Sequence, residues 1–110
     1  MQNKLRTVRR KTEVTIEDVA QLLNIEGNNN LSKFELGLRK PNLETILTYH
    51  LLFEAPLEKL FEEEIKITLK KINKNLKPLI NNIEKLPKTQ RVEARISFLK
   101  VLQDLIQQKI

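Results

Sequence analysis

Apolar residues along this chain recur mostly at steps of three and four, which is the spacing of a helix with one buried side. Strand-like alternation of apolar and polar residues is nowhere sustained. Only two glycines and four prolines interrupt the pattern. The pattern therefore predicts an all-α protein, with short helices before Phe61 and a long one after it.

The first three helices can be placed from their ends. The first is predicted over residues 3–11. Thr15 and Asp18, three residues apart, form a capping box that begins the second. The third should run over about residues 28–36 and end at Gly37, because glycine tolerates the left-handed conformation that stops a helix.

Two more short helices follow Pro41. The fourth carries an apolar side made of Leu43, Ile46, Leu47 and Leu51. Pro56 begins the fifth, since proline is favoured in the first turn of a helix.

Beyond Phe61 the apolar residues alternate steps of four and three, as in a coiled-coil seam. We call this row the heptad stripe: Ile65, Leu69, Ile72, Leu76, Leu79, Ile83 and Leu86. Pro78 interrupts it, so we expect a kink or a break near Lys77. The segment LPKTQ then predicts a reversal into a last helix. The C-terminal region is thus a helical hairpin, an arm that pairs two chains, or both.

The distribution of charge along the chain indicates what kind of molecule the protein binds. The formal net charge is +6, from 20 Lys and Arg against 14 Asp and Glu, which favours polyanionic partners. Residues 1–61 carry 9 basic and 8 acidic side chains, whereas residues 62–110 carry 11 and 6. The positive excess therefore lies mostly in the C-terminal region. Its lysine row, which consists of Lys66, Lys70, Lys74 and Lys77, is interpreted as a solvated helix face, with nucleic-acid contact as the alternative.

The sequence also lacks the groups that several functions require. It contains no cysteine and a single histidine, His50, so it offers no disulfide, thiolate metal site or cysteine nucleophile. It has no glycine-rich phosphate loop and no apolar stretch of the roughly 18 residues that a membrane span needs. We expect no cofactor, no metal, no enzymatic activity and no membrane association, and a cytoplasmic location.

One arrangement of residues points to a family. Arg9 stands near the end of the first helix, Thr15 starts the second, Ala20 lies within it, and LSKFELGLRKP covers the third helix and the loop after it. This arrangement resembles the phage-repressor/Cro type (XRE family) of helix-turn-helix DNA-binding domain, which places its recognition helix in the major groove. The resemblance implies a five-helix repressor-like domain over residues 1–61, followed by the C-terminal region, residues 62–110.

The resemblance also implies roles for individual residues. By position, the base contacts fall to Asn28, Asn29, Asn30, Ser32 and Lys33, and the phosphate contacts to Arg39, Lys40 and Asn42. A salt bridge that ties the first helix to the recognition helix falls to Arg9 and Glu35. Helical spacing independently points Asn29, Asn30 and Lys33 away from the apolar side of the helix. An asparagine amide can pair bidentately with adenine in the major groove.

Three positions depart from the family pattern. Ile16 replaces a glutamine that touches DNA in many members, and Leu36 and Leu38 replace residues that are commonly basic. One extra residue, placed at Glu26–Gly27, leaves the start of the recognition helix open by about one turn.

Two hypotheses follow. The first is a sequence-specific transcriptional regulator that binds double-stranded DNA as a homodimer, with the heptad stripe Ile65, Leu69, Ile72, Leu76, Leu79 and Ile83 as the dimer or hairpin seam. The second is a protein-interaction module with a degenerate helix-turn-helix, such as an antitoxin or accessory factor, that binds a protein partner.

Overall fold

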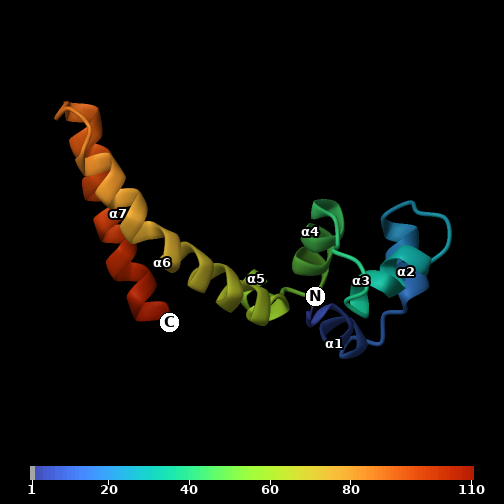
Figure 1. Cartoon of the computed structure of the whole chain (residues 1–110). Helices are drawn as coiled ribbons and strands as arrows, with labels where there is room; N and C mark the ends of the chain where they lie inside the picture. The colour runs from blue at the N-terminus through green and yellow to red at the C-terminus, as the bar shows by residue number, and fades with distance from the viewer. Residues whose placement is uncertain (1) are drawn as a thin grey trace. The chain divides into compact units, whose positions relative to one another are not determined.

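The computed structural model describes residues 2–110, and all regular secondary structure in this range is helical (Figure 1). The helices are α1 (Leu5–Arg10), α2 (Ile16–Leu22), α3 (Asn29–Glu35), α4 (Leu43–Leu52), α5 (Leu57–Leu60), α6 (Glu62–Glu84) and α7 (Gln90–Lys109). The all-α prediction is confirmed. Contacts divide the chain into two compact units, unit 1 (Met1–Ile65) and unit 2 (Lys66–Ile110).

Unit 1 has one core, to which all of its short helices contribute. The buried residues of this core are Leu5, Val8, Val19, Ala20, Leu31, Phe34, Tyr49, Ala55, Leu60 and Phe61. Each large apolar side chain buried in this way stabilises the fold by about 1.5–3 kcal/mol. The core therefore holds α2 and α3 together against α1, which fixes the outward side of α3.

Local sequence sets the ends of α2 and α3. The Thr15 hydroxyl oxygen accepts a hydrogen bond from the Asp18 backbone N–H at 3.1 Å, and the Asp18 carboxylate accepts one from the Thr15 N–H at 3.0 Å. This is the expected capping box. Asn24 (φ 55°) and Gly27 (φ 72°) take the left-handed conformation in the turn, and Gly37 (φ 76°) takes it just after α3.

The apolar side that the sequence indicates for α4 is largely exposed. Leu43, Leu47 and Leu51 face solvent, whereas Thr45 and Tyr49 are the buried residues of this helix. Tyr49 brings both a large ring and a hydroxyl group that bonds to Glu35, so this side of α4 faces the core.

Unit 2 is an antiparallel hairpin of α7 and the part of α6 that begins at Lys66, and the two helices run side by side in Figure 1. Thr89 caps α7 by accepting a hydrogen bond from the Val92 N–H at 3.1 Å. Leu76, Ile80 and Ile106 form the buried cluster, and Leu69, Leu99 and Leu102 pack against it. The two helices therefore pair within the chain.

We expected a kink or a break near Lys77. The break does not occur, because α6 continues through Pro78. Proline removes one backbone hydrogen bond and crowds the preceding turn. Leu76 and Ile80, on either side of Pro78, are both buried in the hairpin cluster. Packing against α7 thus holds the helix together across the defect.

The heptad stripe is only partly the buried side of α6. Leu76 and Ile83 are buried, but Ile72, Leu79 and Leu86 are 40%, 44% and 44% exposed. The residues that face α7 are instead Leu69, Asn73, Leu76, Ile80 and Ile83, which keep the steps of four and three. Asn73 occupies an inner position because its side-chain oxygen accepts a hydrogen bond from the Gln107 amide at 2.9 Å. Because the buried row contains a polar residue, the spacing of apolar residues alone predicted the wrong buried side of α6.

Candidate nucleic-acid interface

Helix α3 has one side in the core and the other in solvent. Leu31, Phe34 and Glu35 are its buried residues. The residues expected to contact bases lie on the opposite side, where Asn29, Asn30 and Lys33 are exposed and Ser32 is half-buried. Asn29 and Lys33 are one helical turn apart, so their side chains share a face. Within residues 2–110 neither makes a side-chain hydrogen bond.

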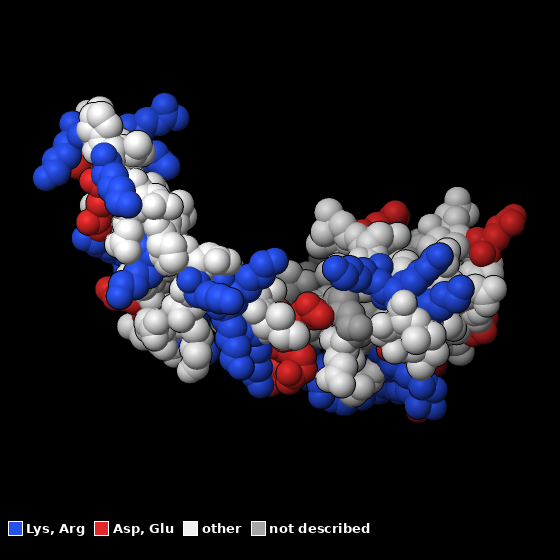
Figure 2. Space-filling model, in the orientation of Figure 1, with Lys and Arg blue, Asp and Glu red and all other residues white. Residues whose placement is uncertain are grey.

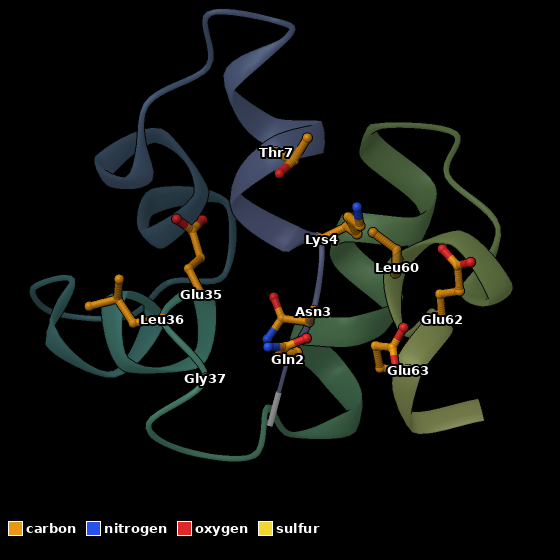
Figure 3. A pocket seen from close by; sticks show the side chains of 10 residues that line it. All are labelled: Gln2, Asn3, Lys4, Thr7, Glu35, Leu36, Gly37, Leu60, Glu62 and Glu63. Carbon is orange, nitrogen blue, oxygen red and sulfur yellow. The ribbon is translucent and has the colours of Figure 1, made fainter. Parts of the chain in front are cut away.

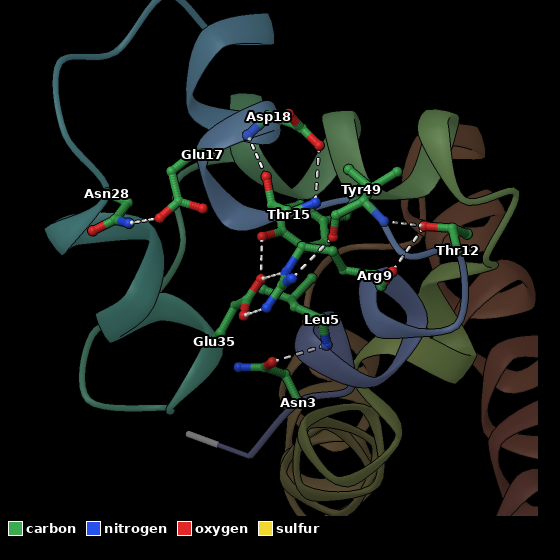
Figure 4. A network of polar contacts seen from close by, with 11 residues as sticks. Asn3, Leu5, Arg9, Thr12, Thr15, Glu17, Asp18, Asn28, Glu35 and Tyr49 are labelled. Atoms are coloured by element: carbon green, nitrogen blue, oxygen red, sulfur yellow. Dashed lines mark hydrogen bonds and ion pairs between the residues drawn. The ribbon is translucent and has the colours of Figure 1, made fainter.

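Asn28 occupies the position just before α3, but its side chain does not cap the helix. Its amide nitrogen donates to the Glu17 carboxylate at 2.8 Å, which joins α2 to the start of α3 (Figure 4). Glu17 also places negative charge near the positive end of the α3 dipole. Asn28 therefore takes part in holding α3 against α2, and one of its donors is already used.

Arg39 folds back over α3 and meets Asn30. The left-handed Gly37 reverses the chain, and the Leu38 N–H donates to the Lys33 carbonyl at 2.9 Å. The Arg39 Nη1 then donates to the Asn30 side-chain oxygen at 2.8 Å. Asn30, expected to contact bases, and Arg39, expected to contact phosphate, thus form one polar pair on the surface. The Asn30 NH₂ and the other guanidinium N–H groups can still donate hydrogen bonds.

The salt bridge expected between Arg9 and Glu35 is present (Figure 4). It is bidentate: Nε of Arg9 donates to one carboxylate oxygen at 2.7 Å and Nη2 to the other at 2.9 Å. The side chains are 12% and 3% exposed. Nη1 of Arg9 also donates to the Val14 carbonyl at 3.0 Å. The guanidinium therefore ties α1 to α3 and to the segment that leads into α2.

Tyr49 of α4 completes this cluster, and sequence reasoning did not select it. Its hydroxyl donates to the Glu35 carboxylate at 2.5 Å. Burial, together with the hydrogen bond to Glu35, raises the pKa of Tyr49 above the ordinary value of 10.0. The hydrogen bonds that Arg9 donates to the Glu35 carboxylate likewise raise the pKa of Arg9. We name Arg9, Glu35 and Tyr49 the buried ion cluster; it connects α3 to both α1 and α4.

The residues expected at phosphates lie after α3. Arg39 and Lys40 are exposed. Asn42 caps α4, since its side-chain oxygen accepts from the Thr45 N–H at 2.8 Å, and its NH₂ group remains a donor. Asn42 therefore has a structural role whatever it contacts outside the chain.

A shallow pocket of about 300 Å³ lies among α1, α2 and α3, beside the exposed side of α3. It is lined by Arg6, Arg9, Ile16, Ser32, Glu35 and Leu36. Arg6 is an exposed cation that sequence reasoning missed, although it stands one turn before Arg9 on the same helix. Arg6 and Ser32 add donors that suit a phosphate group.

A larger pocket, of about 470 Å³, lies between the N-terminal segment and the end of α3 (Figure 3). Asn3, in its wall, donates to the Phe34 carbonyl at 2.8 Å. The lining carries three carboxylates, from Glu35, Glu62 and Glu63, against one lysine. Such a lining does not suit a phosphate group, so this pocket is not part of the interface.

The charges of the two units differ. Unit 1 carries 9 basic and 11 acidic side chains, and unit 2 carries 11 and 3. Figure 2 shows acidic side chains interspersed with Lys and Arg on the visible face of unit 1. Leu36 and Leu38 are 59% and 71% exposed beside this interface. Attraction between unit 1 and DNA would therefore come from a few well-placed cations.

Comparisons with known proteins add no assignment: no family model, curated protein or solved structure matches this chain. In the part of the chain that the structure describes, no three His, Cys, Asp or Glu side chains are grouped so as to hold a metal. No helix in residues 2–110 has the length and apolar character needed to cross a membrane.

Proposed function

We propose that this protein is a sequence-specific DNA-binding regulator of the phage-repressor/Cro helix-turn-helix type, which inserts α3 into the major groove. The observation that carries this proposal is the contrast between the two sides of α3. Its inner side is held to α1 and α4 by the buried ion cluster, while Asn29 and Lys33 stand outward with no partner within the described residues. A rigid helix with outward amide and ammonium groups suits recognition of base edges.

Asn29 and Lys33 are the residues that we assign to bases. An asparagine amide offers one donor and one acceptor, which match N6 and N7 of adenine. A lysine ammonium donates to the O6 and N7 acceptors of guanine. Because the two side chains share a face of α3, they would contact neighbouring base pairs.

Asn30 acts with Arg39 in this proposal. Its oxygen already accepts one hydrogen bond from the Arg39 guanidinium, so the pair offers mostly donors to an external group. Phosphate oxygens accept hydrogen bonds and carry the charge that a guanidinium matches. We therefore assign the Asn30–Arg39 pair, with Lys40, to the DNA backbone, and interpret Asn30 as the residue that orients Arg39.

The protein would bind as a dimer. One small domain buries roughly 600–1,000 Å² on DNA and contacts only a few base pairs, which gives limited specificity. Two copies on half-sites about one helical turn (~34 Å) apart would double the contacted sequence.

Measuring the base preference of variants distinguishes the residues assigned to bases from those assigned to phosphates. Asn29→Ala or Lys33→Ala should relax the preference at one or two positions of the selected sequence, at about 1–3 kcal/mol each. Arg39→Ala should weaken binding to all duplexes alike. It should also reduce the slope of log affinity against log salt concentration by about 1. The matched control is Asn81→Ala, an exposed asparagine of α6. If Asn29→Ala changed preference no more than Asn81→Ala, the assignment of α3 would be wrong.

The second candidate, a protein-interaction module, is favoured by the exposure of Leu36 and Leu38 and by the acidic excess of unit 1. Exposed leucines at the edge of a DNA interface contribute little to phosphate binding, whereas they suit an apolar partner surface. Leu38→Lys distinguishes the two functions. On a DNA-binding surface the added cation should raise affinity for any duplex several-fold at low salt. No change in affinity would favour the protein partner.

A further inference from the structure

The charge of unit 2 is far more positive than that of unit 1. Unit 2 carries 11 basic and 3 acidic side chains, which gives a net charge of +8, whereas unit 1 has a small acidic excess. Figure 2 shows Lys and Arg side chains along much of the visible face of unit 2. Of the three carboxylates of unit 2, Glu84 is already paired with Lys100 at 3.7 Å, and Glu93 and Asp104 belong to α7. The lysines of α6 therefore supply a positive charge that their own helix does not balance.

Three members of the lysine row form one exposed face of α6, which we call the lysine face: Lys70, Lys74 and Lys77. At about 100° per residue they fall within an arc of roughly 60°, and at about 1.5 Å per residue they span roughly 10 Å. Leu76, between the last two of them, is buried in the hairpin cluster, so packing against α7 keeps the three ammonium groups outside. Lys66 is not included, because it follows the acidic residues Glu62 and Glu63 within about one turn.

The lysine face has no acidic partner. Among the described residues 2–110, none of its three lysines takes part in an ion pair. No Asp or Glu occurs from Lys66 to Ile83. Helix faces that are only solvated usually alternate charges of both signs, and like charges one turn apart destabilise a helix. Repulsion within the lysine face therefore opposes the folding of α6, and a bound polyanion would relieve it.

We infer that the lysine face binds the phosphate backbone of double-stranded DNA, as a contact additional to that of α3. A duplex carries one negative charge per about 1.7 Å of its axis, so a length of about 10 Å offers roughly six phosphates to three ammonium groups. Helix α6 has no aromatic side chain on which unpaired bases could stack, which favours a duplex over a single strand. The inference rests on the proposed function for the choice of DNA as the polyanion.

This contact supplies the sequence-independent attraction that the charge of unit 1 does not provide. Lysine contacts to phosphates carry no base information. Unit 2 thus raises the affinity for every duplex, and α3 selects among them. Because both units belong to one chain, binding of a duplex by one unit raises the effective concentration of that duplex at the other.

Binding of the full chain to a duplex of random sequence, measured by fluorescence anisotropy over a series of salt concentrations, tests the inference. The triple variant Lys70→Gln/Lys74→Gln/Lys77→Gln removes three phosphate contacts, each of which contributes about 0.9 to the slope of log affinity against log salt concentration. The magnitude of this slope should therefore fall by about 2–3. The affinity at about 0.1 M salt should fall at least about tenfold.

The matched control, Lys88→Gln/Arg91→Gln/Arg95→Gln, removes the same charge from another part of unit 2. Arg95 lines a groove together with Leu79, which lies roughly 160° around α6 from Lys77. The control variant should lower the magnitude of the slope by less than about 1. Far-ultraviolet circular dichroism checks that both variants keep their helices.

An equal fall of the slope in both variants, or an unchanged slope in the triple variant, would overturn the inference. The inference would also be wrong if the triple variant kept its binding to duplex DNA but lost binding to single-stranded RNA, or to vesicles of phosphatidylserine and phosphatidylcholine. Failure here is distinct from failure of the proposed function, because base preference reports on α3 and the salt slope reports on the lysine face. An unchanged slope with base preference retained overturns only this inference. A wild type without base preference, whose slope falls in the triple variant, contradicts only the proposed function.

Discussion

Removal of Arg9 from the buried ion cluster should destabilise unit 1 severely. Arg9→Met deletes both hydrogen bonds to Glu35 and leaves that carboxylate, 3% exposed, with the Tyr49 hydroxyl as its one remaining donor among residues 2–110. Breaking a buried ion pair in this way costs about 3–5 kcal/mol. A unit of this size has a stability of roughly 3–10 kcal/mol, from about 0.05–0.15 kcal/mol per residue. The single substitution therefore removes a large part of the stability.

The chain provides its own probe for this measurement, because Tyr49 is its single tyrosine and tryptophan is absent. Urea unfolding followed by tyrosine fluorescence thus reports on unit 1. Arg10→Met, at the next and exposed position of α1, is the matched control and should cost less than about 0.5 kcal/mol. Arg9→Met/Glu35→Gln should recover at least half of the loss, since the neutral amide can still accept from Tyr49. The reasoning is refuted if Arg9→Met costs no more than Arg10→Met, or if adding Glu35→Gln makes the loss larger.

Three further predictions concern the same unit. Because the pKa of Tyr49 is raised on folding, the free energy of unfolding should fall as pH rises above about 10, by up to about 1.4 kcal/mol per pH unit. Urea unfolding at several pH values, followed by far-ultraviolet circular dichroism, should show this slope in wild type and lose it in Tyr49→Phe. Asn30→Ala and Arg39→Ala should each weaken DNA binding, and the double variant should be no weaker than Arg39→Ala; additive losses in fluorescence anisotropy would mean that Asn30 acts independently. Thr15→Ala removes the cap of α2 and should cost about 1 kcal/mol by urea unfolding, whereas an unchanged midpoint would contradict the role of the cap.

The fold was predictable where local chemistry decides the structure. The capping box, Gly37 and the reversal before α7 each depend on a few adjacent residues, and each lies where the sequence predicts it. The buried sides of α4 and α6 were not predictable in this way. There, hydrogen bonds between distant residues, Tyr49 to Glu35 and Gln107 to Asn73, place polar side chains in buried rows. Counting apolar residues alone misses such rows.

The candidate site shows the same division. Helical spacing was enough to place Asn29 and Lys33 on the outward side of α3. The pairs Asn28–Glu17 and Asn30–Arg39 depend on how the two turns around α3 fold back, and the sequence holds no simple signal for that geometry. The three adjacent asparagines consequently have three different surroundings.

Selection of bound sequences from a random duplex library by the full chain tests the central claim most directly. The proposed function predicts enrichment of an inverted repeat whose half-sites are about one helical turn apart, with binding that weakens steeply as salt rises. Equal recovery of all sequences at every salt concentration would contradict it.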